Sequence, residues 1–302
     1  MKDAMGKTIG TELLVVGHLN LDHEMEVPFL PSVDRTSPVL DRHVFIGGPA
    51  GNIARWSAKL GLKVALSSFI GRDFPAEFTE ILRKERVDVS RVSVRKGFLT
   101  PACWIARDRA GKQMTMIDQA AMEGTSDLPL SDLKGVGWVH LATGDPGFQL
   151  KVARAAKRLK IPVASDPAQE IHYRWSAKDL RELLSLSEMF FGNLSELEEA
   201  VRMLGLTRPQ DIVKVVPLAI ITMGAKGACA YTRRGTFRCP SAKVKRARGV
   251  TGAGDAFRGG FYSGWLRGEP LERCLELGTK AGAAVIRTPR SLFLPSLFGK
   301  VR

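Results

Sequence analysis

The chain has 302 residues, of which 44% are apolar and 25% are charged, and these are ordinary values for a globular protein. They exclude a mostly disordered chain, while 30 Gly and 16 Pro spread along the sequence exclude a fibrous or coiled-coil one. Lys and Arg (45) exceed Asp and Glu (31) by 14, which indicates an anionic partner without saying which kind.

The first part of the chain alternates between predicted strands and helices. Residues 11–20 are a β-branched run that predicts a buried strand, and 49–61 predict a helix that ends at Gly61. A strand over 63–71 and an amphipathic helix over 75–86 follow. This order predicts a parallel sheet with right-handed crossovers.

Two stretches interrupt this pattern. Residues 23–46 contain three prolines with extended residues between them, and 98–120 predict two strands. Gly111 in the connection between those strands suits a tight hairpin. We expect the two stretches, although far apart in sequence, to pair as a small sheet beside the main one.

The alternation returns after residue 135. Strands are expected over 138–144, 161–166, 188–193 and 218–224, and helices over 147–159, 177–187, 195–204, 252–267 and 271–287. The sequence contains no internal repeat and no interdomain linker. We therefore expect residues 1–302 to form a single α/β domain, with a doubly wound, mostly parallel sheet flanked by helices and a small β insertion.

The cysteines and the N-terminus bear on the compartment. The four cysteines are isolated, which is typical of buried thiols in a reduced cytosol: Cys103, Cys229, Cys239 and Cys274. The apolar run over 13–16 is too short for a signal peptide, and no stretch approaches 18 apolar residues. We expect a cytoplasmic protein with no membrane partner.

The strongest local motif is the segment 251–260, TGAGDAFRGG. Glycines before a helix leave backbone N–H groups free to bind an anion, and the helix dipole reinforces them. Asp255 lies at the same place, where a carboxylate can accept a proton from a hydroxyl that attacks a phosphoryl group. An ordinary capped helix after a glycine turn explains the segment by itself equally well.

Two weaker motifs lie near the N-terminus. Gly47 and Gly48 precede a helix in which Asn52 offers both a donor and an acceptor to a polyol. Asn20 and Asp22 come just past the first predicted strand, where ligands bind in open α/β sheets. An ordinary loop and an Asx turn are the alternative interpretations.

Familiar phosphate-binding and hydrolase motifs are absent from the sequence. It contains no GxxxxGK[ST], no GxGxxG after the first strand, and no GxSxG. HRD and DFG are also missing, which excludes a protein kinase.

Five short motifs occur in a characteristic order along the chain. They are GG-x-x-x-N over 47–52, DP over 166–167, N-x-x-E over 193–196, T-x-G-x-x-G over 222–227 and GAGD over 252–255. In this order they resemble the ribokinase family of sugar and nucleoside kinases, also called the pfkB family, over about residues 10–295. The segments 100–105, 140–146 and 166–169 look most similar to the archaeal broad-specificity nucleoside kinases.

The resemblance implies a ribokinase-like fold and an ATP- and Mg²⁺-dependent kinase of a primary hydroxyl. Asp255 would be the catalytic base, with the amides of Gly252, Ala253 and Gly254 as the anion hole. Residues that would contact the acceptor are Asp22, Gly48, Asn52 and Gln169.

The donor side is implied in the same way. Asn193 and Glu196 would order the magnesium-bound phosphates, with Glu196 acting on Mg²⁺ mostly through water. Thr222, Gly224 and Gly227 would line the phosphates of ATP. Residues 98–120 with part of 23–46 would form a lid, which could also make a homodimer.

One position departs from the family pattern. Gly249 stands where family members commonly have an Asp that helps to bind an activating monovalent cation, so potassium activation is in doubt.

The favoured acceptor is the 5′-hydroxyl of a nucleoside. A kinase of a sugar or sugar phosphate is the alternative, and a phosphorylated acceptor would need basic residues such as Arg35, Arg42, Arg107 or Arg109. A catalytically silent nucleic-acid-binding protein is the remote alternative. Its support would be the basic run over 243–248, which an exposed strand explains more simply, so we expect no nucleic-acid partner.

Overall fold

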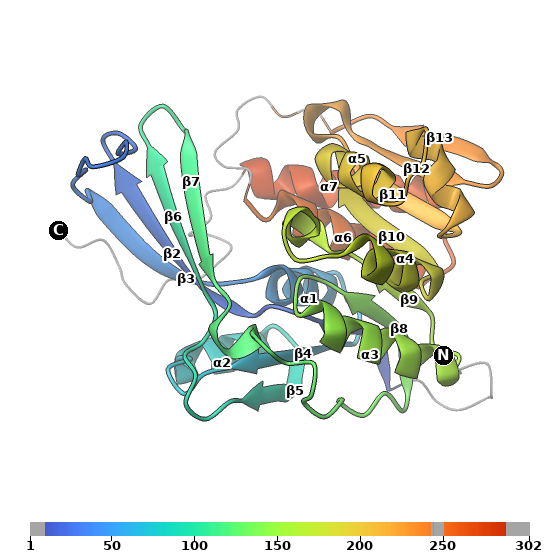
Figure 1. The fold of residues 1–302 in the computed structure, drawn as a ribbon, viewed down its shortest axis with the longest axis horizontal. Helices are drawn as coiled ribbons and strands as arrows, with labels where there is room; N and C mark the ends of the chain where they lie inside the picture. The colour runs from blue at the N-terminus through green and yellow to red at the C-terminus, as the bar shows by residue number, and fades with distance from the viewer. Residues whose placement is uncertain (1–9, 243, 245–250, 288–302) are drawn as a thin grey trace.

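The computed structural model of this chain describes residues 10–242, 244 and 251–287. Within these residues the strands form a nine-stranded main sheet and a four-stranded small sheet (Figure 1). The main sheet has the order β13-β12-β11-β10-β9-β8-β1-β4-β5. Its strands are β1 (Thr11–Val16), β4 (Val64–Ile70), β5 (Val87–Val94), β8 (Val136–Leu141), β9 (Val163–Ser165), β10 (Met189–Asn193), β11 (Leu218–Thr222), β12 (Ala228–Thr232) and β13 (Gly235–Cys239).

The main sheet is parallel from β5 across to β11, and β12 and β13 are antiparallel to their neighbours. The chain first runs outward from β1 through β4 to β5 and then restarts at β8 on the other side of β1. The strand order therefore reverses between β1 and β8. In open α/β sheets, the crevice beyond the carboxyl ends of the strands at such a point is where ligands bind.

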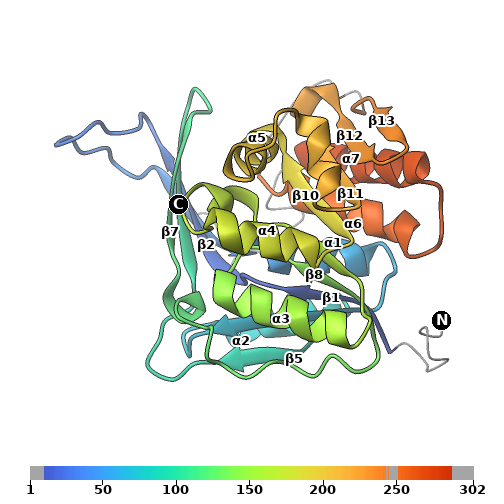
Figure 2. The ribbon, with the colours of Figure 1, turned by 45° about the vertical axis from the view of Figure 1, so that its right-hand side comes forward.

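Helices cover both faces of the main sheet (Figure 2). One face packs against α1 (Pro49–Lys59), α2 (Ala76–Lys84), α6 (Ala253–Trp265) and α7 (Leu271–Arg287), and the other against α3 (Pro146–Arg158), α4 (Ala177–Ser185) and α5 (Leu194–Met203). In β1, Leu13 and Val15 enter the first of these cores, while Leu14 and Val16 enter the second. A strand that buries both faces has no polar alternation, which is why this run is continuously apolar.

The small sheet is built from the two stretches that interrupt the α/β pattern. Its order is β3 (Asp41–Gly47), β2 (Asn20–Val27), β6 (Ala102–Asp108) and β7 (Gln113–Asp118). β2 pairs with β6 in parallel, and the two outer pairs are antiparallel. The sheet stands beside the main one at the left of Figure 1. The expected doubly wound, mostly parallel sheet with a separate small sheet is thus confirmed.

Some elements differ from the sequence expectations. The apolar run over 11–20 is not one strand, because the chain turns at Gly17 (φ +145°) and β2 begins at Asn20. Asn20 and Asp22 therefore lie in a strand of the small sheet and not in a turn. The strands β5, β12 and β13 were not expected. The residues of β12 are mostly small, and what makes them a strand is pairing with β11.

The state of the four cysteines and the length of the helices follow directly from the structure. All four thiols are free, three of them are buried, and Cys239 is partly exposed. Among the described residues, no helix is long and apolar enough to cross a membrane.

Glycines let α6 pack closely against its two neighbours. A Cβ atom on Gly259 would lie 2.7 Å from Trp56 Cβ and 3.0 Å from the Ser57 nitrogen of α1. On the opposite side, a Cβ on Gly260 would lie 2.5 Å from the Leu277 carbonyl oxygen of α7. The distance between these three helices is therefore set by the absence of side chains on α6.

We predict that Gly259→Ala destabilises the fold, because the added methyl group meets the backbone of α1, which cannot rotate away. The expected loss of unfolding free energy is roughly 1–3 kcal/mol, measured by urea denaturation. Gly10→Ala is the control, since a Cβ there meets nothing within 4 Å. An equal effect of the two substitutions would contradict this interpretation of the α1–α6 contact.

Candidate active site

The reversal of strand order between β1 and β8 brings several loops together. The His18 N–H donates to the Thr143 carbonyl oxygen (3.1 Å), which joins the end of β1 to the loop after β8. Gly48, which caps the N-terminus of α1, has φ +81°, and a Cβ on it would lie 2.3 Å from the His18 carbonyl oxygen. The start of α1 therefore packs directly on the turn that follows β1.

Asp22 is buried beside the same turn. It lies in β2, with Phe45 opposite it in β3, and a Cβ on Gly47 would come 2.0 Å from the Asp22 carboxyl carbon. Each glycine of the pair thus makes room for a different neighbour, Gly47 for Asp22 and Gly48 for the His18 backbone. This packing brings Asp22 to the N-terminus of α1, where Gly48 and Asn52 lie.

Asp255 meets this group from α6. The Asn52 side chain donates its Nδ2 hydrogen to Asp255 Oδ2 at 2.9 Å. Burial raises the pKa of the Asp255 carboxyl group to about 6, against the opposing effects of Arg258 and of the Asn52 hydrogen bond. The negative charges of Asp166 and Asp22 raise this pKa further. Asp255 can therefore exchange a proton near neutral pH, as a general base must.

The N-terminus of α6 presents backbone N–H groups beside Asp255. Gly252 precedes the helix in the left-handed conformation (φ +81°), and the first helical hydrogen bond runs from Ala256 N–H to Gly252 O at 2.9 Å. The N–H groups of residues 253–255 precede that bond and are available to an anion. Arg107 of β6 donates to Thr251 Oγ1 (3.3 Å), so the small sheet reaches the start of this helix.

A buried ionic cluster, which the sequence analysis missed, lies beneath Asp255. Arg258 binds Asp166 through two nitrogens, with Nη2 at 2.8 Å from Oδ1 and Nε on Oδ2. Burial would raise the pKa of Asp166, but Arg258 and His140 outweigh it and hold that pKa at about 2. The available signal was an arginine in a helix whose other residues are small or apolar.

Asn193 and Glu196 form a reciprocal cap at the start of α5. The Glu196 N–H donates to Asn193 Oδ1 (3.0 Å), and the Asn193 N–H and Nδ2 donate to the two Glu196 oxygens (2.7 and 2.8 Å). Burial raises the pKa of Glu196, partly offset by Arg258. The described residues contain no cluster of three or more metal-ligating side chains. A single carboxylate fits Mg²⁺ that arrives with phosphates and keeps its waters.

The T-x-G-x-x-G motif lies next to this cap. Thr222 ends β11 as the register partner of Asn193, so both lie at the carboxyl ends of neighbouring parallel strands. Gly224 (φ +58°) begins the short helix η4 (Gly224–Lys226), and Gly227 (φ +91°) follows it. A Cβ on Gly227 would lie 2.1 Å from the Cys239 carbonyl oxygen, so packing alone already requires that glycine.

Gln169 stands apart from the other predicted contacts. It is exposed on η2 (Ala168–His172), whereas its neighbour Glu170 is buried in a hydrogen-bond chain. In that chain His18 Nε2 lies 2.6 Å from Gln119 Oε1, and Gln119 Nε2 donates to Glu170 Oε1 (2.9 Å). Glu170 Oε2 then accepts from the Gly144 N–H (2.6 Å). The sequence analysis gave no role to His18, Gln119 or Glu170.

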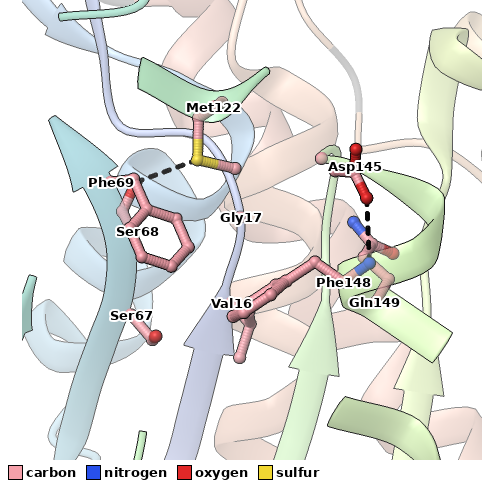
Figure 3. A pocket seen from close by; sticks show the side chains of 10 residues that line it. Val16, Gly17, Ser67, Ser68, Phe69, Met122, Asp145, Phe148 and Gln149 are labelled. Carbon is pink, nitrogen blue, oxygen red and sulfur yellow. Dashed lines mark hydrogen bonds between the residues drawn. The ribbon is translucent and has the colours of Figure 1, made fainter. Parts of the chain in front are cut away.

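A small hollow lies under the loops at the β1–β8 reversal (Figure 3). Its lining includes Gly17 at the end of β1, Met122 and Phe148. It has no room for a water molecule, so it is a packing gap and not a place for a ligand.

Two features singled out in the sequence lie outside the described residues. They are Gly249 and, apart from Val244, the basic run over 243–248.

Comparison with known proteins places this arrangement among kinases. Residues 10–295 match the model of the pfkB family carbohydrate kinases. The nucleoside kinase of Methanocaldococcus jannaschii is 30% identical over 276 residues, which are 91% of this chain and 90% of that protein. The crystal structure of that kinase, described as an archaeal member of the ribokinase family, has a TM-score of 0.85 and covers 92% of this chain and 93% of its own.

Two further relatives differ in the substrate that their names print. The cytidine kinase of Thermococcus kodakarensis is 29% identical over 286 residues, covering 91% of this chain and 96% of that protein. The ATP-dependent ribose-1-phosphate kinase of Halopiger xanaduensis is 27% identical over 278 residues, covering 90% of each.

We predict that the charge of Asp255 costs stability above its pKa. Because the folded pKa of about 6 exceeds the ordinary value of 3.8, the protonated carboxyl group favours folding, and this contribution is lost as pH rises from about 4 to above 6. Asp255→Asn should therefore be as stable as the native chain near pH 4 and more stable at pH 8. The gain at pH 8 has an upper limit of about 3 kcal/mol, measured by urea denaturation.

The control for this measurement is Asp127→Asn, an exposed aspartate. It should leave the difference between pH 4 and pH 8 unchanged. A stability gain for Asp255→Asn that is the same at both pH values would refute the raised pKa.

Proposed function

This chain belongs to the pfkB family of carbohydrate kinases, and on that basis we propose that it transfers the γ-phosphoryl group of ATP to the 5′-hydroxyl of nucleosides. The observation that carries the proposal is the meeting of Asp255 with Asn52 and Asp22 beside the free amides of α6. The names of its nucleoside and cytidine kinase relatives support the choice of acceptor.

The reaction proceeds by in-line displacement. The acceptor hydroxyl oxygen bonds to the γ-phosphorus as the bond from that phosphorus to the β–γ bridging oxygen breaks, and ADP leaves with that electron pair. Asp255 takes the hydroxyl proton, for which its pKa of about 6 suits it at neutral pH. The amides of Gly252, Ala253 and Gly254, with the dipole of α6, face the negative charge of the phosphoryl group.

The small-sheet face that carries Asp22 suits a nucleoside. A buried carboxylate can accept hydrogen bonds from two neighbouring ribose hydroxyls, with Gly48 and Asn52 beside it. By strand alternation, Phe45, Cys103 and Ile105 share the face of Asp22, and all three are buried. Such an apolar wall suits a flat base, and Gln169, exposed on η2, would add a polar contact.

The donor side of the proposed site lies at α5 and η4. Asn193 and Glu196 would order the phosphates and their Mg²⁺ through water, and Thr222, Gly224 and Gly227 would line the phosphates. When bound, Mg²⁺ supplies positive charge to the phosphate oxygens. The capping box fixes the Glu196 carboxylate in one orientation, which suits a water-mediated contact.

A sugar phosphate is the alternative acceptor, and the ribose-1-phosphate kinase relative keeps it open. Strand alternation places Arg42 on the face opposite Asp22, and Arg35 and Arg109 are exposed in connections between strands. Arg107 alone among these four shares the face of Asp22, and it is engaged with Thr251 near the phosphoryl end. These positions favour an acceptor without a phosphate.

The remaining proposals concern cations, partners and location. Gly249 in place of the usual Asp favours turnover without an activating monovalent cation. An intact Asp255 favours a kinase over a silent nucleic-acid-binding protein. A cytoplasmic location, where ATP and Mg²⁺ are available, suits this activity.

We predict that an acceptor screen with ATP and Mg²⁺ finds the highest kcat/KM with a nucleoside, ahead of ribose, ribose 1-phosphate and fructose 6-phosphate. Rates in NaCl and KCl should agree. Asp255→Asn should lower kcat by roughly 100- to 10,000-fold, because the asparagine amide cannot take the hydroxyl proton. A sugar phosphate as the best acceptor would overturn the nucleoside assignment, and near-normal turnover by Asp255→Asn would overturn the mechanism.

We further propose that the outer face of the small sheet forms a homodimer, with the sheet acting as a lid. His23 stacks on Trp104 there (centroids 5.5 Å apart), and Met116 is 55% exposed on the same face. An apolar sheet face of this kind is typical of an interface. Sedimentation should give a dimer for the native chain and a monomer for Met116→Glu, with Thr115→Glu on the opposite face as the control. A monomeric native chain would refute this.

A further inference from the structure

Arg258 is a buried cation whose three nitrogens all have partners in the described structure. It lies one turn after Asp255 in α6 and is 5% exposed. Two of its nitrogens bind the carboxylate of Asp166, and the third, Nη1, donates to the Gly254 carbonyl oxygen at 3.1 Å. Such a fork has a fixed plane, so Asp166 determines where the third nitrogen points.

The contact with Gly254 acts on the peptide group next to the proposed anion hole, whose N–H, that of Asp255, is one of the first-turn amides available to an anion. The Gly254 carbonyl and the Asp255 N–H belong to the same planar peptide, so holding the oxygen also holds the direction of that N–H. A cationic donor on the oxygen also makes the N–H a stronger donor. Arg258 therefore orients and strengthens an amide donor at the anion hole, although its own side chain does not contact the phosphoryl group.

Arg258 also faces several acidic groups from different elements. Asp255 shares its helix, Asp166 follows β9, Glu196 is in α5, and Asp22 in β2 acts on Asp255. The charge of Arg258 lowers the pKa of Asp255, whereas the charges of Asp166 and Asp22 raise it.

His140 is the other titratable group against this cluster. Its Nε2 lies 3.4 Å from Asp166 Oδ2, and its Nδ1 is 2.8 Å from the Tyr262 hydroxyl. Burial lowers the pKa of His140, so it is neutral at pH 7 and adds no positive charge. Arg258 is therefore the residue whose positive charge offsets these carboxylates.

We propose that Arg258, oriented by Asp166, is a positioning residue for phosphoryl transfer that keeps Asp255 ionised and fixes the Gly254–Asp255 peptide toward the transferred group. This inference rests on the proposed kinase function. Arg258 and Asp166 act on Asp255 and on the anion hole, and neither residue touches the substrate.

The test uses two substitutions that act on Asp255 in opposite directions. Arg258→Met removes the positive charge, so the acidic limb of the kcat–pH profile should move up by about one unit or more. Asp166→Asn removes a negative charge, so the same limb should move down. Both variants should lower kcat with little change in KM, because the peptide loses its orientation. A purely structural role cannot produce limb shifts of opposite sign.

Three further variants serve as controls, for misfolding, for the geometry of the fork and for the loss of an ion pair elsewhere. Arg258→Met leaves Asp166 buried without a partner, whereas the double variant Arg258→Met/Asp166→Asn removes both charges and should fold. Its acidic limb should lie above that of Asp166→Asn. Arg258→Lys keeps the charge but loses the fork, so the limb should stay near the native position while kcat falls. Arg55→Met, which breaks a buried pair with Glu85 instead, should leave the limb unmoved.

A second readout separates this inference from the proposed function. NMR titration of carboxyl-labelled Asp255 in the ligand-free protein should show the same opposite shifts, whether or not any nucleoside is phosphorylated. If the native chain lacks kinase activity but the shifts occur, the proposed function fails and the effect of Arg258 on Asp255 stands. Unmoved limbs and titrations in both single variants, or shifts in the same direction, would overturn the inference.

Discussion

The close approach of α1 and α6 is the constraint on which the rest of the site depends. Gly259 lets the two helices meet without intervening side chains, and their first turns lie beside each other. Asn52 from one helix consequently reaches Asp255 from the other at 2.9 Å. The same packing brings the first turn of α6 beside residues that we propose contact the acceptor. A wider separation would leave each motif intact and remove the site.

Electrostatics imposes a second condition at the same edge. Carboxylates from four elements collect around the start of α6, and each loses hydration there. The Arg258–Asp166 pair divides them into two kinds, since Asp166 stays ionised with its partner while Asp255 has a pKa near neutral pH. The surroundings thus give two aspartates different pKa values, one well below neutral pH and one near it, and the second suits the proposed proton acceptor.

The small sheet contributes one face to this edge and another to the outside. Its two central strands, β2 and β6, come from segments that are far apart in the chain, and Gly47 gives Asp22 space against the backbone. The inner face combines the Asp22 carboxylate with apolar side chains. Arg107 on the same face donates a hydrogen bond to Thr251. The outer face is apolar and exposed around Trp104 and Met116. One sheet can therefore serve both a substrate and a second copy of the chain.

The sequence by itself determined the alternating α/β order, the small sheet and the candidate roles of Asp22, Asn52 and Asp255. Strands and helices that bury a face have apolar residues at a regular spacing in the sequence. Glycines at fixed positions indicate where one backbone segment must approach another. The edge strands β5 and β13, and β12 beside β13, were not predicted, because their identity comes from a neighbour and not from their own pattern.

Only the tertiary structure decided the partners of the buried charges. Asp166 and Arg258 are 92 positions apart, and neither sequence neighbourhood contains a sign of the other. His18, Gln119 and Glu170 likewise form their chain across three separate loops. The composition of α6 indicates that Arg258 is buried, but it does not indicate which carboxylate pairs with it. The function of such a charged residue is fixed by the loss of water and by the charge that replaces it, and both are properties of the packed molecule.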